Sequence, residues 1–487
     1  MTRRLLPFAL LFAAALLALA AAASGWPRAH HTGRTQRALL LDPTPEGDIS
    51  PFEAQSLGSL LMDALETRTD LAVTNLSKLP EPYQPEGDLL LLRPRMARTG
   101  VNLSLSLEWA ELGPGRDGAW HTAAPGPGAP DATIEAAVDA LPVEASPANL
   151  VLLPRDPERF WELLKADSAV YSNVGLDDAL ALGQRLAGEE PGCAAIQASI
   201  AHLDTIRILQ NPQPLDGRVD LALAAADKAL ALLPGYPRAL RFAARLLSDQ
   251  GRQDEALNRL QDGLRLHPRS LNLLLALDYA ARTAGLLDIA LGARERMAAL
   301  WTGAPVAPPT GFTYLYAGRL EAFETSLPTR PGVTPDGFTA FNLGYAALIR
   351  GRREEAARRF QEVEQDAAAE DHFRALAKVF RFQIEGRTAD ARQALDLLDR
   401  SRMGLQVPDG EFTFTMAEAA AFLGEEGLAM DLSQRAFSQG FVCAAWYRGS
   451  PFMAALQPLP RWQSILQHVD ERQGRLAALH QPRDFGL

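Results

Sequence analysis

Cysteine is almost absent from this chain of 487 residues, which contains two. Cys193 and Cys443 lie far apart in the sequence, and both stand in segments that read as helical and apolar. A bridge between such distant residues would need closely placed Cβ atoms, which sequence does not reveal. We therefore favour two separate buried thiols over a disulfide.

Basic residues and recognisable catalytic motifs are also scarce. The chain has 48 Lys and Arg against 59 Asp and Glu, a formal net charge of -11 and a pI near 5.4. This balance excludes a general nucleic-acid binder, which needs a basic surface. The sequence has no phosphate-cradling glycine loop, G-x-S-x-G elbow, H-E-x-x-H or paired C-x-x-C. We expect no catalytic residue, no metal site and no cofactor.

One long apolar run is present, at residues 5–23, and Arg3 and Arg4 precede it. Its nineteen residues reach about the length that spans a bilayer. Ala21 and Ala23 also offer a cleavage site of the A-x-A kind. Residues 1–26 therefore predict either a signal peptide or a membrane anchor. Both alternatives place the residues after Trp26 outside the cytoplasm, so we expect no cytoplasmic effector.

Glycine and alanine form a ladder through the C-terminal half. Six glycines each stand five residues before an alanine, and from the first pair the alanine spacing is 34, 34, 66, 35 and 38. The pairs are Gly217/Ala222, Gly251/Ala256, Gly285/Ala290, Gly351/Ala356, Gly386/Ala391 and Gly424/Ala429. This period is typical of helical-hairpin arrays, which stack into a solenoid that holds a partner.

The clearest unit is 237–270, where Leu240, Ala243 and Leu247 share one helix face, Gly251 supplies a turn and Pro268 ends a second helix. These features resemble the tetratricopeptide repeat. Further units are expected at 271–304, 337–371, 372–403 and 410–441. Residues 305–336 contain Ala322 without a matching glycine, which predicts either a degraded repeat or a break in the solenoid.

A different pattern occupies residues 37–142. Apolar and polar residues alternate from Val101 to Trp109, as in a strand with one buried face. Shorter strands are expected at 38–41, 71–76, 88–92 and 119–123, with a turn at 113–118. Helices are expected at 51–68, capped by Ser50, and at 132–141.

This order resembles the amino-terminal domain of the TolB translocation protein, in the form joined to repeats in bacterial cyclases, kinases and membrane-bound transcription regulators. That family has a second helix where this chain has Pro80, Pro82 and Pro85, so we expect that helix to be short or lost. Residues 440–467, with Phe441, Cys443 and Trp446, resemble a terminal motif of the same group.

The predicted fold is a multidomain α+β chain, with a small α/β domain at 37–142, an all-α tetratricopeptide-repeat superhelix at 157–440 and a cap at 441–480. The resemblance implies a bacterial protein, located in the periplasm and either tethered by residues 5–23 to the inner membrane or released after cleavage.

In such superhelices the first helix of each repeat lines a concave groove. Carried over by register, the groove positions are Arg238, Arg241, Arg245, Asn272, Tyr279, Arg282, Phe338, Phe341, Tyr345, Phe373, Phe380 and Gln383. The three arginines of residues 238–245 share one helix face and could grip a carboxylate or an acidic peptide. Alternatively they pair with nearby carboxylates such as Asp249 and Glu255. Likewise Tyr279, Tyr345 and Phe380 form either a groove floor or packing between repeats.

The sequence thus predicts an interaction scaffold or sensory module with a protein or peptide partner, which the arginines would allow to be acidic. Its rivals are an envelope-acting hydrolase with an unrecognised site and an assembly factor for an envelope complex. A pocket with converging carboxylates or a histidine would favour the enzyme. An open groove around Arg241, Arg245 and Tyr279 would favour binding. A break between Ala290 and Ala356 would separate the arginine-rich part of the groove from its aromatic part.

Overall fold

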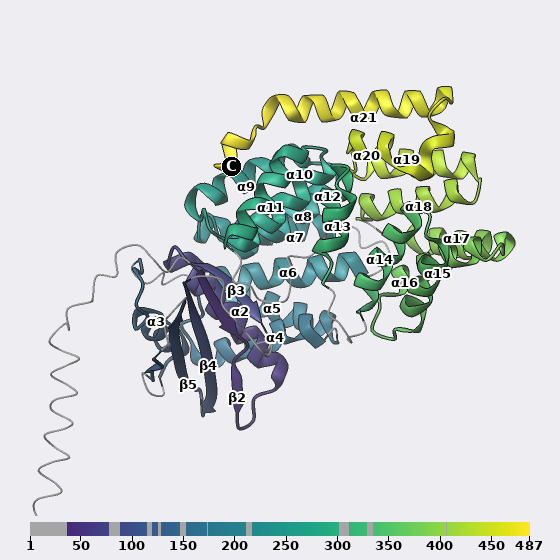
Figure 1. Cartoon of the computed structure of the whole chain (residues 1–487). Helices are drawn as coiled ribbons and strands as arrows, with labels where there is room; N and C mark the ends of the chain where they lie inside the picture. Colours follow the sequence, from purple (N-terminus) through teal and green to yellow (C-terminus); the bar gives the residue numbers. More distant parts are fainter. Residues whose placement is uncertain are drawn as a thin grey trace, which may run out of the picture.

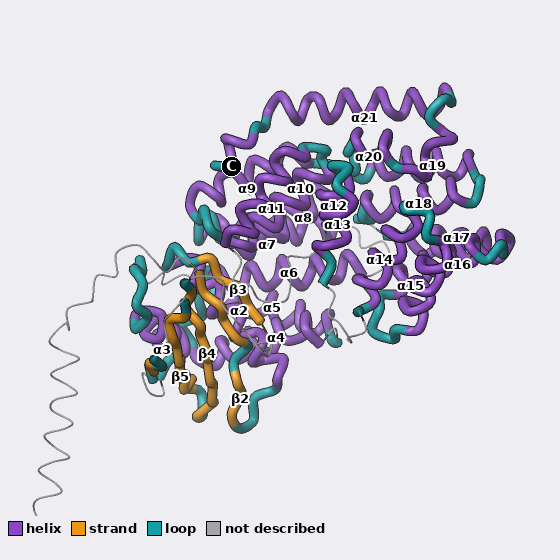
Figure 2. Tube along the Cα trace, in the orientation of Figure 1, coloured by secondary structure: helices purple, strands orange, loops and turns teal. Residues whose placement is uncertain are grey.

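The fold is mostly helical, with one sheet near the N-terminal end followed by tiers of antiparallel helices (Figures 1 and 2). The computed structural model describes residues 37–76, 88–113, 119–124, 128–146, 152–172, 174–210, 217–300, 311–328, 335–405 and 407–487. The apolar run at 5–23, the three prolines at 80–85 and most of the predicted turn at 113–118 lie outside these ranges. Within them, no helix has both the length and the apolar character needed to cross a bilayer.

The sheet combines parallel and antiparallel pairs. Its path is β3-β1-β4-β5-β6, with β2 beside β4, and β1 runs parallel to both of its neighbours. Leu103, Leu105 and Leu107 are buried on one face, as the alternating pattern predicts. The strands are β1 (Arg37–Leu41), β2 (Thr44–Glu46), β3 (Ala72–Leu76), β4 (Leu89–Thr99), β5 (Asn102–Leu112) and β6 (His121–Ala123).

Two helices accompany the sheet, α2 (Pro51–Arg68) and α3 (Pro130–Asp139). Helix α2 has the predicted bounds because Ser50 and Glu53 form a capping box, with reciprocal hydrogen bonds of 3.1 and 2.9 Å. Apolar residues of α2 pack with the sheet, and its acidic residues Asp63 and Glu66 are buried against α8 (Pro237–Asp249) and α10 (Leu271–Thr283). One continuous apolar core therefore joins the sheet to the helical array.

The array consists of stacked helical hairpins, as the ladder predicts. Gly251, Gly285, Gly351, Gly386 and Gly424 all lie at hairpin turns with φ between 74 and 78°, a conformation that glycine adopts without strain. The six ladder alanines are fully buried, so paired helices approach closely. The helices are α4 (Pro157–Ser172), α5 (Leu176–Glu189), α6 (Ala194–Gln210), α7 (Arg218–Leu232), α8 (Pro237–Asp249), α9 (Gln253–Leu266), α10 (Leu271–Thr283), α11 (Leu287–Leu300), α14 (Gly337–Ile349), α15 (Arg353–Gln365), α16 (Asp371–Ile384), α17 (Thr388–Arg402), α18 (Gly410–Phe422) and α19 (Glu426–Ser438).

A shortened hairpin stands at the interruption of the ladder, so the degraded-repeat alternative holds there. It consists of α12 (Phe312–Tyr316) and α13 (Leu320–Ser326), joined by Gly318 at φ 74°. Ala322 has no glycine five residues before it, as expected, but Gly318 still makes the turn, and Phe323 stands five residues after it where the ladder has an alanine. Phe323 is fully buried at the position of the small residue.

The C-terminal segment both covers the last repeat and returns to the early ones. It contains α20 (Ala444–Gly449), the 3₁₀ helix η1 (Pro451–Leu456), α21 (Pro460–Leu479) and the 3₁₀ helix η2 (Pro482–Phe485). Helix α21 runs from the α19 end of the array back to α9 (Figure 1). Arg472 Nη2 donates to Gln253 Oε1 at 2.8 Å, and Val442 N donates to Thr283 O at 2.8 Å. The array is therefore closed on itself.

Both cysteines are free and buried, in agreement with the prediction of separate thiols. Burial raises the pKa of each thiol to about 12. Cys193 donates to Leu152 O, and Cys443 lies at the start of α20.

Candidate functional site

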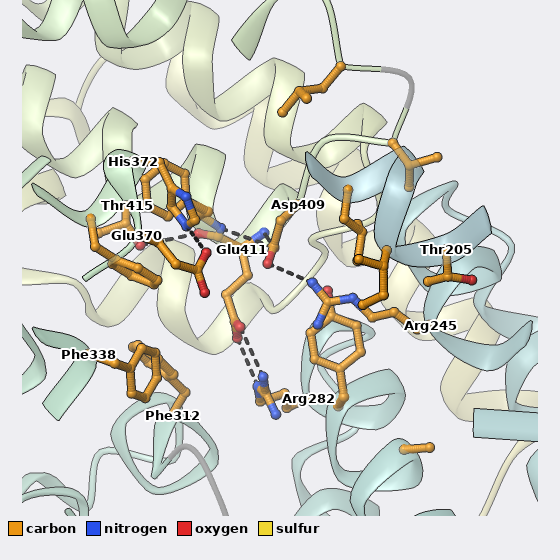
Figure 3. Close-up of a pocket in the computed structure, with 18 of the residues that line it drawn as sticks. Thr205, Arg245, Arg282, Phe312, Phe338, Glu370, His372, Asp409, Glu411 and Thr415 are labelled. Carbon is orange, nitrogen blue, oxygen red and sulfur yellow. Dashed lines mark hydrogen bonds and ion pairs between the residues drawn. The ribbon is translucent and has the colours of Figure 1, made fainter. Parts of the chain in front are cut away.

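A cavity of about 530 Å³ lies at the centre of the closed array, where the first helices of successive hairpins face one another. Figure 3 shows that side chains from distant parts of the chain converge on it, including Arg245, Phe338, His372 and Glu411. Its volume falls in the range of small-ligand sites. The predicted concave groove is thus a partly open cavity, because α20 contacts α12, α21 contacts α9, and Arg245 and Arg282 bind Asp409 and Glu411 across it.

Aromatic rings make a continuous wall along one part of the cavity. Phe338 meets Phe373 edge to face at 5.4 Å between ring centroids, and Phe373 meets Phe412 at 5.6 Å in the same way. Phe341 lies 5.3 Å from Phe373 and extends the wall. These rings come from α14, α16 and α18, so the wall is assembled from three hairpins.

Arg245 of α8 joins this side of the array to the loop before α18. Its Nε donates to Asp249 at 2.6 Å and its Nη2 to Asp409 at 2.9 Å, and its guanidinium lies 3.9 Å above the Tyr279 ring. Burial raises the pKa of Asp249 to about 7. Against the effect of burial, Arg245 holds the pKa of Asp409 below its ordinary value.

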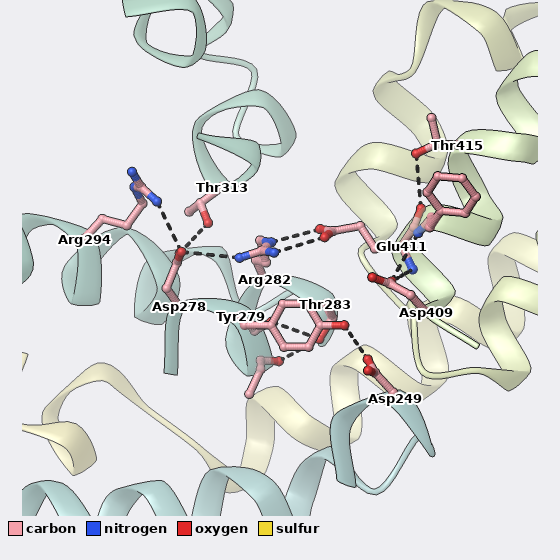
Figure 4. A network of polar contacts seen from close by, with 12 residues as sticks. Asp249, Asp278, Tyr279, Arg282, Thr283, Arg294, Thr313, Asp409, Glu411 and Thr415 are labelled. Atoms are coloured by element: carbon pink, nitrogen blue, oxygen red, sulfur yellow. Dashed lines mark hydrogen bonds and ion pairs between the residues drawn. The ribbon is translucent and has the colours of Figure 1, made fainter. Parts of the chain in front are cut away.

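A second ion pair closes the cavity between α10 and α18. Arg282 donates to both carboxylate oxygens of Glu411, at 2.9 and 3.0 Å (Figures 3 and 4). Behind it, Asp278 accepts from Arg282 and Arg294 and from the Thr313 hydroxyl (Figure 4). Burial raises the pKa of Asp278, although both arginines oppose that shift.

His372 and Glu370 also line the cavity, at the start of α16. His372 Nε2 lies 3.4 Å from Glu370 Oε2, and the imidazole packs against Phe373 and Phe412. Burial, assisted by Arg402, lowers the pKa of His372 to about 4. The imidazole is therefore neutral near pH 7.

The structure brings part of the predicted groove set into this cavity. Arg241, Arg245, Tyr279 and Arg282 line it together with Phe338, Phe341 and Phe373. The arginine-rich and aromatic parts are thus in one chamber, because the degraded hairpin continues the array and the C-terminal hairpins fold back. The Gly/Ala ladder did not predict this closure, because each pair describes only the turn within one hairpin.

Arg238 and Asn272 instead face helices of the N-terminal region. Arg238 Nη2 donates to Asp167 Oδ2 at 2.7 Å, and its Nη1 lies 3.6 Å from Asp63. Asn272 donates to Glu66 at 3.1 Å and accepts from Arg241 at 2.9 Å. The arginines of α8 therefore do not form one cluster, since each has different partners.

Three further predicted groove residues pack between repeats. Tyr345 donates to Glu418 and lies against Phe452, with ring centroids 5.7 Å apart. Phe380 stacks on Phe360 at 5.4 Å. Gln383 donates to the Phe422 carbonyl at 3.2 Å. For Tyr345 and Phe380 the packing alternative therefore holds, whereas Tyr279 faces the cavity.

Sequence reasoning missed the residues that the later hairpins contribute. Glu411 occupies the same repeat position as Arg238, so extending the groove register to the repeat at 410–441 would have included it. Arg402, His372 and Asp409 lie at helix ends, where no repeat position signals a side chain that turns inward. Among the described residues, no group of three or more His, Cys, Asp or Glu side chains could hold a metal ion.

No family model and no curated protein matches the chain. Solved structures with some likeness are the Cut9–Hcn1 hetero-tetramer of the APC/C, a Rap protein complexed with competence and sporulation factor, and the TPR domain of P58(IPK). Their TM-scores are 0.38, 0.34 and 0.19, with 14, 11 and 13% identity. The matches cover 64, 72 and 66% of this chain and 56, 92 and 98% of the others.

Because these TM-scores are low, the fold of this chain is assigned from its own geometry. Hairpin length, turn glycines and buried alanines recur in register along the array. By these features the chain is a helical-repeat protein built from two-helix hairpins.

Proposed function

We propose that this chain is a binding module that receives part of a partner in its central cavity. The observation that carries the proposal is the partly open cavity of about 530 Å³, which is lined by aromatic rings and arginines of successive first helices. Such a space admits a chain end or a small molecule, whereas a folded surface is too large for it. Binding through first helices agrees with a role as interaction scaffold or sensory module.

The proposal includes a location outside the cytoplasm. The apolar run at 5–23 with its preceding arginines supports export, with the helical array in the periplasm. The sheet region, which resembles the TolB amino-terminal domain, packs on α4, α8 and α10 and would report occupancy of the array to an envelope partner.

The test is capture of partners from envelope extracts with three versions of the chain. Ala276 lines the cavity, so Ala276→Trp fills part of it, while Leu397→Trp adds the same ring on an exposed position of α17. We expect the first substitution to remove a partner that the wild type and the second retain. Identical partner sets for all three versions would contradict binding in the cavity.

A second candidate function is catalysis by an envelope-acting hydrolase, favoured by the His372 and Glu370 pair in the cavity wall. The cavity does contain a histidine and several carboxylates, but Asp409 and Glu411 are held by Arg245 and Arg282. The hydroxyls of Thr205 and Thr415 donate to carbonyls of their own helices. Hydrolysis of a generic ester or peptide that His372→Gln abolishes would support the enzyme over the binding module.

A further inference from the structure

The arginines of the cavity wall differ in their charge compensation. Arg245 and Arg282 each hold carboxylates at hydrogen-bond distance. Within the described ranges, neither Arg241 nor Arg402 forms an ion pair at the 4.0 Å limit, although Asp409, Asp249 and Glu370 act on Arg402 from farther away. Arg241 donates to the neutral amide of Asn272 at 2.9 Å. Among the residues that the structure describes, Arg402 therefore has neither a carboxylate nor an amide acceptor at hydrogen-bond distance.

The surroundings of Arg402 are aromatic. Its guanidinium lies 4.4 Å from the centroid of the Phe412 ring, and its Nε is buried and has no hydrogen-bond partner within the described ranges. Burial lowers the pKa of Arg402, because nearby carboxylates do not fully offset the loss of water. A planar guanidinium in this position suits a carboxylate, which it can bind through two parallel hydrogen bonds.

The carboxylates already in the wall do not supply this partner. Asp409 and Glu411 are engaged by Arg245 and Arg282. Glu370 lies beside His372 with its side chain 71% exposed, and it makes no ion pair with Arg402. An anionic group brought by a ligand would thus find Arg402 available.

An apolar surface continues from Arg402 along the cavity wall. Phe412 lies under the guanidinium. The Phe373 ring contacts Phe412 at a centroid distance of 5.6 Å, and the Phe338 ring contacts Phe373 at 5.4 Å. Aromatic faces and edges of this kind bind a flat apolar group. The cation and the rings together fit a ligand that carries both features close to each other.

We propose that the cavity binds the carboxylate end of an aromatic ligand, with Arg402 holding the carboxylate and Phe412, Phe373 and Phe338 holding the ring. This inference rests on the proposed binding function and adds the chemical class of the occupant. The carboxylate can belong to the C-terminal residue of a peptide or to a free aromatic acid, since both present the same groups.

The test measures binding of four probes to the full chain by titration calorimetry. They are 3-phenylpropanoate, its amide, the tripeptide Ala-Ala-Phe and the same tripeptide with an amidated C-terminus. We expect each acid to bind at least about tenfold more tightly than its amide, because a charge-assisted hydrogen bond contributes on the order of 1.5 kcal/mol or more. Tighter binding of the tripeptide acid than of 3-phenylpropanoate identifies a chain end, and the reverse order identifies a free acid.

Variants at Arg402 assign the preference to this residue. Arg402→Gln should lower the affinity for the acids to that for the amides, and Arg402→Lys should retain part of the difference. The matched control is Arg400→Gln on the same helix, where Arg400 is exposed and pairs with Asp396 at 2.8 Å. Thermal unfolding of each variant shows that the fold is kept.

The outcomes separate this inference from the proposed function. If acids and amides bind equally and Ala276→Trp abolishes both, the cavity binds ligands but the carboxylate preference is overturned. The same holds if Arg402→Gln keeps the preference for acids. If none of the four probes binds the wild type, the inference is overturned, whereas partner capture with Ala276→Trp and Leu397→Trp still decides the proposed function.

Discussion

At the scale of single residues, tertiary packing determines whether an arginine of α8 is buried in an ion pair or lines the cavity. Arg238 and Arg245 lie on the same face of α8, yet Arg238 is buried against Asp167 and Asp63 of the N-terminal region. Arg245 is held by Asp249 and Asp409 at the cavity. The i, i+7 spacing predicts a shared face, but it does not predict that the two ends of one helix meet different neighbours.

Glu66 leads to a prediction about pH. Its side chain is buried between α2 and α10, where it accepts from Ser270 Oγ at 3.0 Å and Asn272 Nδ2 at 3.1 Å. Burial raises its pKa from 4.5 to about 7. Between these values the native state keeps a proton that the unfolded state has lost, so the free energy of unfolding falls as pH rises from 4.5 to 7.

Glu66→Gln should remove this contribution. We expect the variant to match the wild type at pH 4, below the unfolded-state pKa, and to exceed its free energy of unfolding at pH 8 by up to about 3 kcal/mol. Urea denaturation at the two pH values measures the difference, with Glu295→Gln on the exposed side of α11 as control. Equal pH dependence of wild type and Glu66→Gln would contradict a buried, protonated Glu66.

At the scale of elements, the hairpin turns share one backbone conformation but differ in surroundings. Gly351 has φ 75° with open space around its Cα. Gly285 has φ 74°, and a Cβ there would lie 2.9 Å from the Val442 carbonyl oxygen and against the Gln473 side chain. The first turn faces solvent, whereas the second is covered by the C-terminal segment.

The two substitutions to alanine should therefore have different costs. Gly351→Ala strains only the left-handed backbone and should lower the free energy of unfolding by roughly 1 kcal/mol. Gly285→Ala adds a contact that the carbonyl cannot relieve and should cost on the order of 2 to 3 kcal/mol. Urea denaturation of both variants measures these losses in the free energy of unfolding. Equal losses would show that α21 does not contact the Gly285 turn closely.

Prediction of elements from sequence succeeded where the signal is local. The capping box at Ser50 fixes the start of α2, and the glycines of the ladder fix the hairpin turns. It failed at α12 and α13, because Phe323 replaces the expected alanine and both helices are short. A bulky residue at that position gives no periodic signal, although Gly318 keeps the turn.

At the scale of the whole molecule, the C-terminal helix α21 closes the array. Arg472 donates to the Gln253 side chain and to the Gly251 carbonyl, and it also bonds Phe437 O at 3.2 Å. These bonds link α21 to the α8–α9 turn and to α19. Closure in turn brings the two sides of the cavity together.

Weakening this link should open the array locally without unfolding the repeats. Arg472→Met should increase amide hydrogen exchange at the α8–α9 turn and in η2, because fewer hydrogen bonds hold α21 against the early hairpins. Arg475→Met, an exposed position on the same helix, is the matched control. Hydrogen-exchange mass spectrometry measures both variants, and unchanged exchange in Arg472→Met would contradict a role of this residue in closure.

The sequence by itself determined most of the helical hairpins, their order and the N-terminal strands other than β2 and the second half of β4, because periodicity, caps and glycine conformation act within a few residues. Tertiary structure alone decided that the array closes and that a cavity forms. The Arg245–Asp409 bond joins residues 164 positions apart, and the Arg282–Glu411 pair joins residues 129 apart. Neither pair has a local signature, since each carboxylate reaches its arginine only after several hairpins have stacked and turned the chain back on itself.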